Sequence, residues 1–158
     1  MSVSPEVLTQ LLTATEEVFE TMVFKPVSRQ DPITDDTVKP KSNVVASVAF
    51  AGHRRGLVAF NSSLGTARVI AGAMLGMPAE DVNGEMPDAI GEIANMIAGS
   101  FRTKLAAIEP PSAIAVPTVT IGSDFSTKYM SQSHRVLCPF HMDGEAIHVE
   151  LILTGEPS

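Results

Sequence analysis

Twice along the chain, a long amphipathic helical segment is followed by a pair of β-rich runs. Residues 5–23 and 88–108 carry apolar side chains at the spacing of a helix that buries one face. Residues 43–61 and 134–153 each resemble a strand hairpin, and the second contains Asp143-Gly144, a dipeptide that favours a two-residue turn. This order predicts an α+β fold: a two-layer domain of long helices packed on a mostly antiparallel sheet, built from two pseudo-symmetric halves.

Length and charge limit the classes of partner. The 158 residues suit one domain spanning residues 1–158. The formal net charge is −7, whereas nucleic-acid affinity depends on clustered Lys and Arg. The nearest basic cluster, His53-Arg54-Arg55, falls in a predicted hairpin turn, where a solvated turn explains it. We therefore expect no nucleic-acid partner.

Cysteine content and hydropathy indicate the compartment. The single cysteine, Cys138, excludes an internal disulfide and suits a reducing compartment. The first residues lack the basic and apolar regions of a signal peptide, and no apolar run approaches membrane-spanning length. We expect a cytoplasmic protein that does not insert into membranes.

Two local signals concern backbone geometry. Ser62 or Ser63 can cap a short helix that runs to Leu75 and stops at Gly76. Pro117 lies inside a strand-like run at residues 113–121, where it removes a backbone donor. A sheet edge or a bulge is therefore expected at Pro117.

The 88–108 helix carries a polar stripe formed by Asp88, Glu92, Asn95 and Gly99, at spacings of four, three and four. The opposite side is the predicted core face, made of Ile90, Ile93, Ala94, Ile97, Phe101, Leu105 and Ile108. Such a stripe can be an ordinary solvated face. However, Asn and Gly are poor helix formers, and no Lys or Arg stands in the stripe to pair with Glu92. A carboxylate can pair with a cation on a docked partner, and a carboxamide can position a water.

The pattern Asp88-x3-Glu92-x2-Asn95, with 21 residues between Asn95 and Pro117, resembles the signature of the CheC/CheX/FliY family of chemotaxis phosphatases. The segments GEIANMIAGSF and TEEVFETMVF, and the order of helices and hairpins, support the resemblance. The first helix offers Glu17 and Glu20 at the corresponding spacing but no Asn. One intact site is the arrangement of CheX.

The resemblance implies a homodimer with one site per subunit. The implied substrate is the aspartyl phosphate of a CheY-type receiver domain. By this resemblance Asn95 would orient the attacking water and Glu92 would pair with a receiver lysine. Asp88 and Gly99 would belong to the partner-binding face, and Pro117 would be structural. No cofactor is expected in this chain, because the receiver would supply Mg²⁺.

A metal centre, a nucleophilic site and a non-catalytic docking surface are the alternatives to this site. The four histidines (His53, His134, His141 and His148) show no metal-ligand spacing, so no metal site is expected, and no Ser or Cys nucleophile has a supporting constellation. The alternative from another functional class is a non-catalytic receiver-binding or flagellar-switch-like interaction module. Asn95 favours the enzyme, since docking alone does not require it.

Overall fold

The computed structural model describes residues 3–128 and 133–154. Helix α1 (Pro5–Val18) continues as a π-helical turn, η1 (Phe19–Val23), and a 3-10 turn, η2 (Ala79–Asp81), precedes the longest helix. The remaining elements, in chain order, are β1 (Ser28–Arg29), β2 (Ser42–Gly52), β3 (Arg55–Ser62), α2 (Leu64–Leu75), α3 (Met86–Leu105), β4 (Ser112–Ile114), β5 (Thr118–Phe125), β6 (Ser133–Met142) and β7 (Glu145–Thr154).

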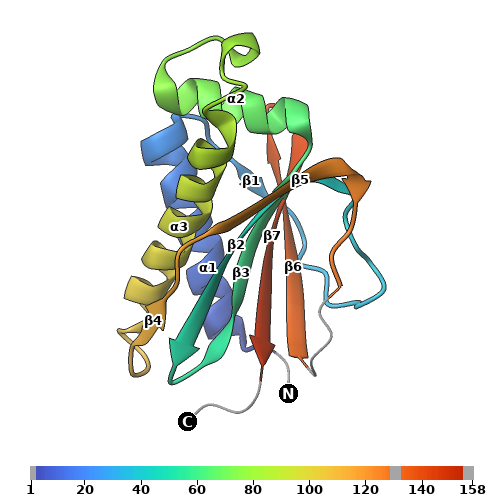
Figure 1. Cartoon of the computed structure of the whole chain (residues 1–158). Coiled ribbons are helices and arrows are strands. Elements are labelled where there is room, and N and C mark those ends of the chain that lie inside the picture. The colour runs from blue at the N-terminus through green and yellow to red at the C-terminus, as the bar shows by residue number, and fades with distance from the viewer. Residues whose placement is uncertain (1–2, 129–132, 155–158) are drawn as a thin grey trace.

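All strand pairs are antiparallel, in the order β1-β6-β7-β3-β2-β4, and β5 also pairs with β2. Helices α1 and α3 lie side by side on one face of this sheet, and α2 crosses one end (Figure 1). The predicted α+β class is confirmed. No helix in the described part of the chain has the length and apolar character that a membrane crossing requires.

The sheet has an internal two-fold order. Strands β3 and β7 pair at its centre, β2 and β6 flank them, and β5 and β1 lie outside these. The units α1-β1-β2-β3 and α3-β5-β6-β7 therefore exchange places under a two-fold rotation. This confirms the prediction of pseudo-symmetric halves.

Both predicted hairpins are present. The turn between β6 and β7 is Asp143-Gly144, with φ of 51° and 81°, as a type I′ turn requires. The β2–β3 hairpin turns at His53-Arg54. Ser63 caps α2 by accepting a hydrogen bond from the amide of Thr66, and Gly76 ends it at φ 67°.

The end of α3 differs from the prediction. The helix stops at Leu105, because the amides of Ile108 and Glu109 both turn back to the Leu105 carbonyl ahead of Pro110. Ile108 consequently lies beyond the helix and is 42% exposed, so its assignment to the core face is wrong.

Pro117 marks a break in the predicted strand, which divides into β4 and β5. Ile114 lies opposite Phe50 and Thr118 opposite Ser47, so three residues, 115–117, face two on β2. This extra residue is a bulge, one of the two features expected at Pro117. It inverts the alternation of side chains, so that Val119 rather than Thr118 packs against the core.

Candidate functional site

Helix α3 is amphipathic along its whole length. Its buried residues are Met86, Ala89, Ile90, Gly91, Ile93, Ala94, Ile97, Ala98, Phe101 and Leu105. Asp88 and Glu92 are exposed, while Asn95 and Gly99 are partly exposed. The structure thus brings all four stripe residues together on the outward side of one rigid helix.

Asp88 lies in the first turn of α3 rather than at its cap. The capping position is Glu85, which makes no side-chain capping bond, and Pro87 occupies the first turn. The Asp88 carboxylate therefore stabilises the helix start through the helix dipole, which favours negative charge at this end.

Glu92 and Asn95 make no side-chain hydrogen bond or ion pair with any other residue that the structure describes. The α1 carboxylate that corresponds to Glu92 is Glu17, and it pairs with Lys104 of α3 at 3.0 Å. Its neighbour Glu16 accepts a hydrogen bond from Arg29 Nε at 2.9 Å. A cation within the chain therefore engages Glu17, whereas Glu92 remains available to a cation from outside.

The structure places Pro117 against α3. A methyl group at Gly91 would lie 3.6 Å from Pro117 Cγ and 3.2 Å from Val119 Cγ2. The residue immediately before Glu92 is therefore packed beneath the β4–β5 bulge. Sequence reasoning missed Gly91, although a glycine in mid-helix costs up to about 1 kcal/mol relative to Ala and so signals a packing constraint.

Gly99 has the opposite surroundings. A methyl group there would meet no described atom within 4 Å beyond its own helical turn. Packing within the chain does not demand glycine at this position.

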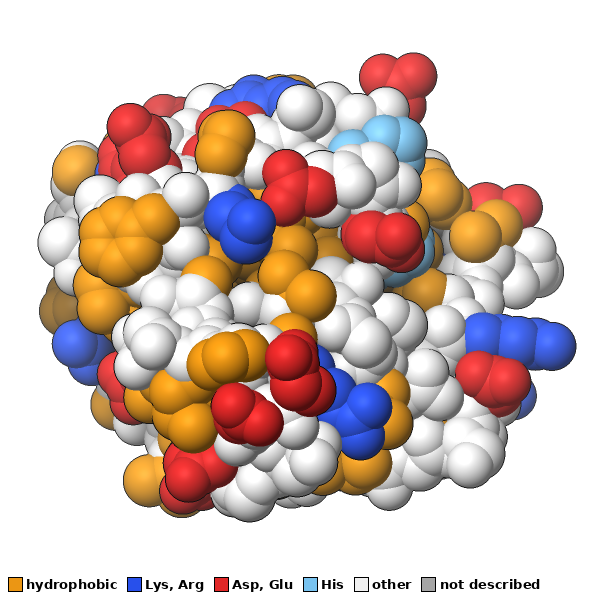
Figure 2. All heavy atoms as spheres, turned by 90° about the horizontal axis from the view of Figure 1, so that it is seen from above, with side chains coloured by type: hydrophobic (Ala, Val, Ile, Leu, Met, Phe, Trp, Pro, Cys, Tyr) orange, Lys and Arg blue, Asp and Glu red, His pale blue; other side chains and the backbone are white. Residues whose placement is uncertain are grey.

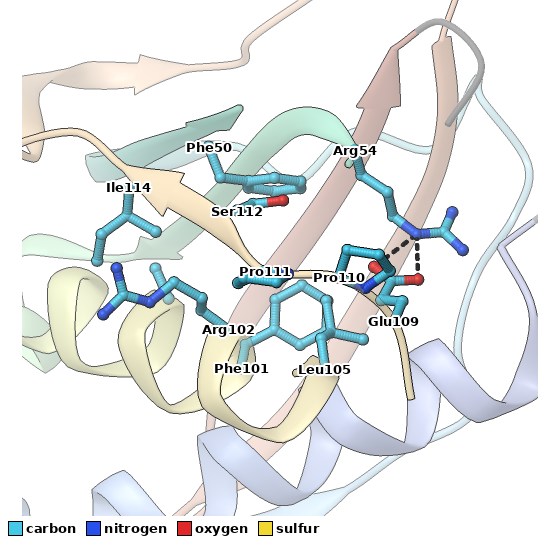
Figure 3. Close-up of a pocket in the computed structure, with 11 residues that line it drawn as sticks. Phe50, Arg54, Phe101, Arg102, Leu105, Glu109, Pro110, Pro111, Ser112 and Ile114 are labelled. Atoms are coloured by element: carbon cyan, nitrogen blue, oxygen red, sulfur yellow. Dashed lines mark hydrogen bonds and ion pairs between the residues drawn. The ribbon is translucent and has the colours of Figure 1, made fainter. Parts of the chain in front are cut away.

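The two hollows that the described residues form near α3 and α2 are lined by no residue of the polar stripe. The hollow beside α3 lies between Phe101, Leu105 and strand β4, and the Arg54–Glu109 ion pair (2.8 Å) stands at one side (Figure 3). Its volume of about 20 Å³ holds roughly one water. The candidate site is therefore an exposed helix surface rather than a small-molecule cavity.

A larger groove of about 410 Å³ lies at the α2 end, between the start of α2 and the β6–β7 turn. Ser63, the only serine among the described residues that line it, caps α2, and Asp143 pairs with Lys25 at 2.9 Å. Figure 2 shows acidic, basic and apolar side chains interspersed over this end of the molecule. The groove presents no arrangement of nucleophile and base.

The structure describes the surroundings of Cys138, His141 and His148. Cys138 is buried, and burial raises the pKa of its thiol to about 12, so it remains a neutral core side chain. His141 and His148 are not cross-strand partners, because His141 faces Ala146. Among the described residues, no group of three His, Cys, Asp or Glu side chains gathers as metal ligands would.

Comparison with known proteins gives a family match. The family model for the chemotaxis phosphatase CheX matches residues 44–141. No curated protein sequence matches the chain.

Solved structures share the fold over nearly the whole chain. The chemotaxis protein CheX of Desulfovibrio desulfuricans is 28% identical, with a TM-score of 0.87 over 94% of this chain and 99% of that chain. The CheX of a CheX–CheY–BeF3–Mg²⁺ complex from Borrelia burgdorferi is 22% identical, with a TM-score of 0.81 over 94% and 98%. FliY of Thermotoga maritima is 17% identical, with a TM-score of 0.67 over 98% and 92%.

Proposed function

This chain belongs to the CheX family of chemotaxis phosphatases, and from that premise we propose that it dephosphorylates the aspartyl phosphate of a CheY-type receiver domain. One observation carries the proposal: Glu92 and Asn95 stand one turn apart on the exposed side of α3, and the described structure gives neither an internal partner. The fold shared with the CheX of a CheX–CheY complex supports a receiver as the partner.

The form of the site favours a protein substrate. Small substrates are held in concave pockets, and the stripe on α3 lies on an open helix face. A receiver domain can bring its own phosphoryl group, Mg²⁺ and lysine, so this chain needs no cofactor of its own. The encounter would take place in the cytoplasm.

The chemistry requires little beyond positioning. Water oxygen attacks phosphorus, the bond from phosphorus to the aspartyl oxygen breaks, and the products are a free carboxylate and inorganic phosphate. Because an acyl phosphate is already activated, catalysis can come from orienting the water and stabilising charge. The Asn95 carboxamide holds both an acceptor and a donor for that water. Glu92 pairs with the receiver lysine and sets the docking register.

The other stripe residues frame this pair. Gly99 offers an unobstructed surface on which the receiver backbone can approach closely, and Asp88 extends the polar face toward the helix start. Each subunit of the proposed homodimer would carry one such site on α3.

The test is Asn95→Ala, measured for both receiver binding and phosphate release. If Asn95 orients water, the maximal rate falls on the order of 100-fold, while the half-saturating receiver concentration changes little. Asn83→Ala, in the exposed turn before α3, is the control and keeps the wild-type rate. A maximal rate near wild type for Asn95→Ala would reject the phosphatase and favour a non-catalytic receiver-docking module.

A further inference from the structure

The placement of α3 alone determines where Glu92 and Asn95 stand. No hydrogen bond or ion pair within the described residues restrains either side chain. Their positions therefore depend on the rotation and height of the helix over the sheet. The contacts that support α3 at this turn therefore also set the positions of the Glu92 and Asn95 side chains.

One support beside the pair is the segment between β4 and β5, which runs alongside α3 in Figure 1. It meets the helix at Gly91, where an added methyl group would come within 3.2 Å of Val119 Cγ2. Gly91 directly precedes Glu92 and lies four residues before Asn95, one turn away on the same side of the helix. The contact thus borders both residues.

The bulge creates this contact. Without the extra residue among 115–117, the alternation set by Ile114 would turn Thr118 toward the helices and Val119 away from them. With it, Val119 faces Gly91, and Pro117 packs beside it at 3.6 Å from the same methyl position. This geometry explains how a proline 22 positions after Asn95 belongs to the same site.

We propose that Gly91 is a positioning residue: its contact with Val119 and Pro117 holds α3 at the height and rotation that place Glu92 and Asn95 against the receiver. The inference rests on the proposed phosphatase function. A side chain at Gly91 would push the helix away from β5 by a few tenths of an ångström, because Val119 is itself held in the sheet opposite Ala46.

The experiment compares Gly91→Ala, Val119→Ala and the double variant. Gly91→Ala should lower the maximal dephosphorylation rate on the order of 10-fold, since catalysis by positioning is sensitive to sub-ångström displacement. The fold-change in the half-saturating receiver concentration should be smaller than the fold-change in the maximal rate. In the Val119→Ala background, where the clashing Cγ2 is gone, Gly91→Ala should lower the rate less than twofold.

Gly65→Ala in α2 is the matched control. It is also a glycine-to-alanine change within a helix, but the added methyl group meets no described atom within 4 Å. The Gly65→Ala variant should therefore dephosphorylate the receiver at the wild-type rate. Circular dichroism and thermal unfolding identify any variant that fails to fold, and rescue by Val119→Ala shows that a rate loss comes from this contact.

Each outcome has a separate meaning. If the wild type is active and Gly91→Ala has the same maximal dephosphorylation rate, the positioning role is overturned. An equal rate loss in both backgrounds would also overturn it, because Val119 would not be the source. A wild type that releases no phosphate from any receiver of the organism would overturn the proposed function itself.

Discussion

Glu92 presents a carboxylate on the exposed side of α3 that no cation of the described chain neutralises. An exposed ion pair contributes little, but a pair desolvated at an interface can contribute several kcal/mol. Glu92→Ala should therefore raise the half-saturating receiver concentration by 10-fold or more and leave thermal stability unchanged. Phosphate release at subsaturating receiver measures this effect.

Glu20→Ala is the control for Glu92→Ala, because Glu20 is also an exposed helical carboxylate, located in η1, the turn that continues α1. Its phosphate-release rate should remain at the wild-type value. A wild-type rate for Glu92→Ala under the same conditions would remove Glu92 from the docking interface.

Glu150 is a carboxylate in the opposite situation. Its side chain is 3% exposed and pairs with Arg135, whose side chain is 4% exposed. Replacing one partner leaves a buried charge uncompensated, so Glu150→Leu should lower the free energy of unfolding by about 3–5 kcal/mol. Denaturant titration measures this change, and Arg135→Met with Glu150→Leu should recover most of it. A loss below about 1 kcal/mol for Glu150→Leu would mean that solvent reaches the pair.

At the scale of elements, α1 with its continuation η1 shares the pattern of buried residues of α3. When Glu17 is aligned with Glu92, six buried positions coincide: Leu11 with Met86, Ala14 with Ala89, Thr15 with Ile90, Val18 with Ile93, Phe19 with Ala94 and Val23 with Ala98. The outward positions have diverged. Glu20 stands where α3 has Asn95, and Phe24, 74% exposed, stands where α3 has Gly99. Only α3 keeps both the carboxamide and the open surface.

The edge strands meet these two helices at equivalent points. On α1, Glu16 bonds to Arg29 of β1, and on α3 the aligned residue, Gly91, contacts Val119 of β5. A polar contact holds one helix and a close steric contact holds the other.

The sequence predicted the elements that depend on local pattern. Apolar spacing located α1 and α3, and the turn residues of Asp143-Gly144 located a hairpin. The polar stripe on α3 followed from the same spacing, because the core face leaves its opposite side exposed.

What the sequence could not predict depends on contacts between distant segments. The sequence separation between Asn95 and Pro117 does not reveal that Pro117 packs against α3. That contact is made at Gly91 and depends on where β5 crosses the helix. The periodicity also extended the core face to Ile108, since spacing cannot show where the chain leaves the helix.

At the scale of the whole molecule, the two edges of the sheet are unequal. One edge ends in β1, a strand of two residues, whereas β5 has eight residues and pairs with β2. Ile121 on β5 is 49% exposed, and Val116 in the bulge is 83% exposed. A long edge strand with exposed apolar side chains is a surface on which a second chain can pair.

We predict that two copies pair through β5 and form a homodimer, since a two-fold axis makes such an antiparallel pairing self-complementary. Light scattering at micromolar concentration should give twice the chain mass. Ile121→Lys should shift the mass toward the monomer, because pairing across the axis would bring two like charges together. Met22→Lys is the control: it also places a charge on an exposed apolar residue, in η1 at the end of α1, and should leave the dimer intact. A monomer mass for the wild type would exclude the dimer, and an unchanged mass for Ile121→Lys would place its interface elsewhere.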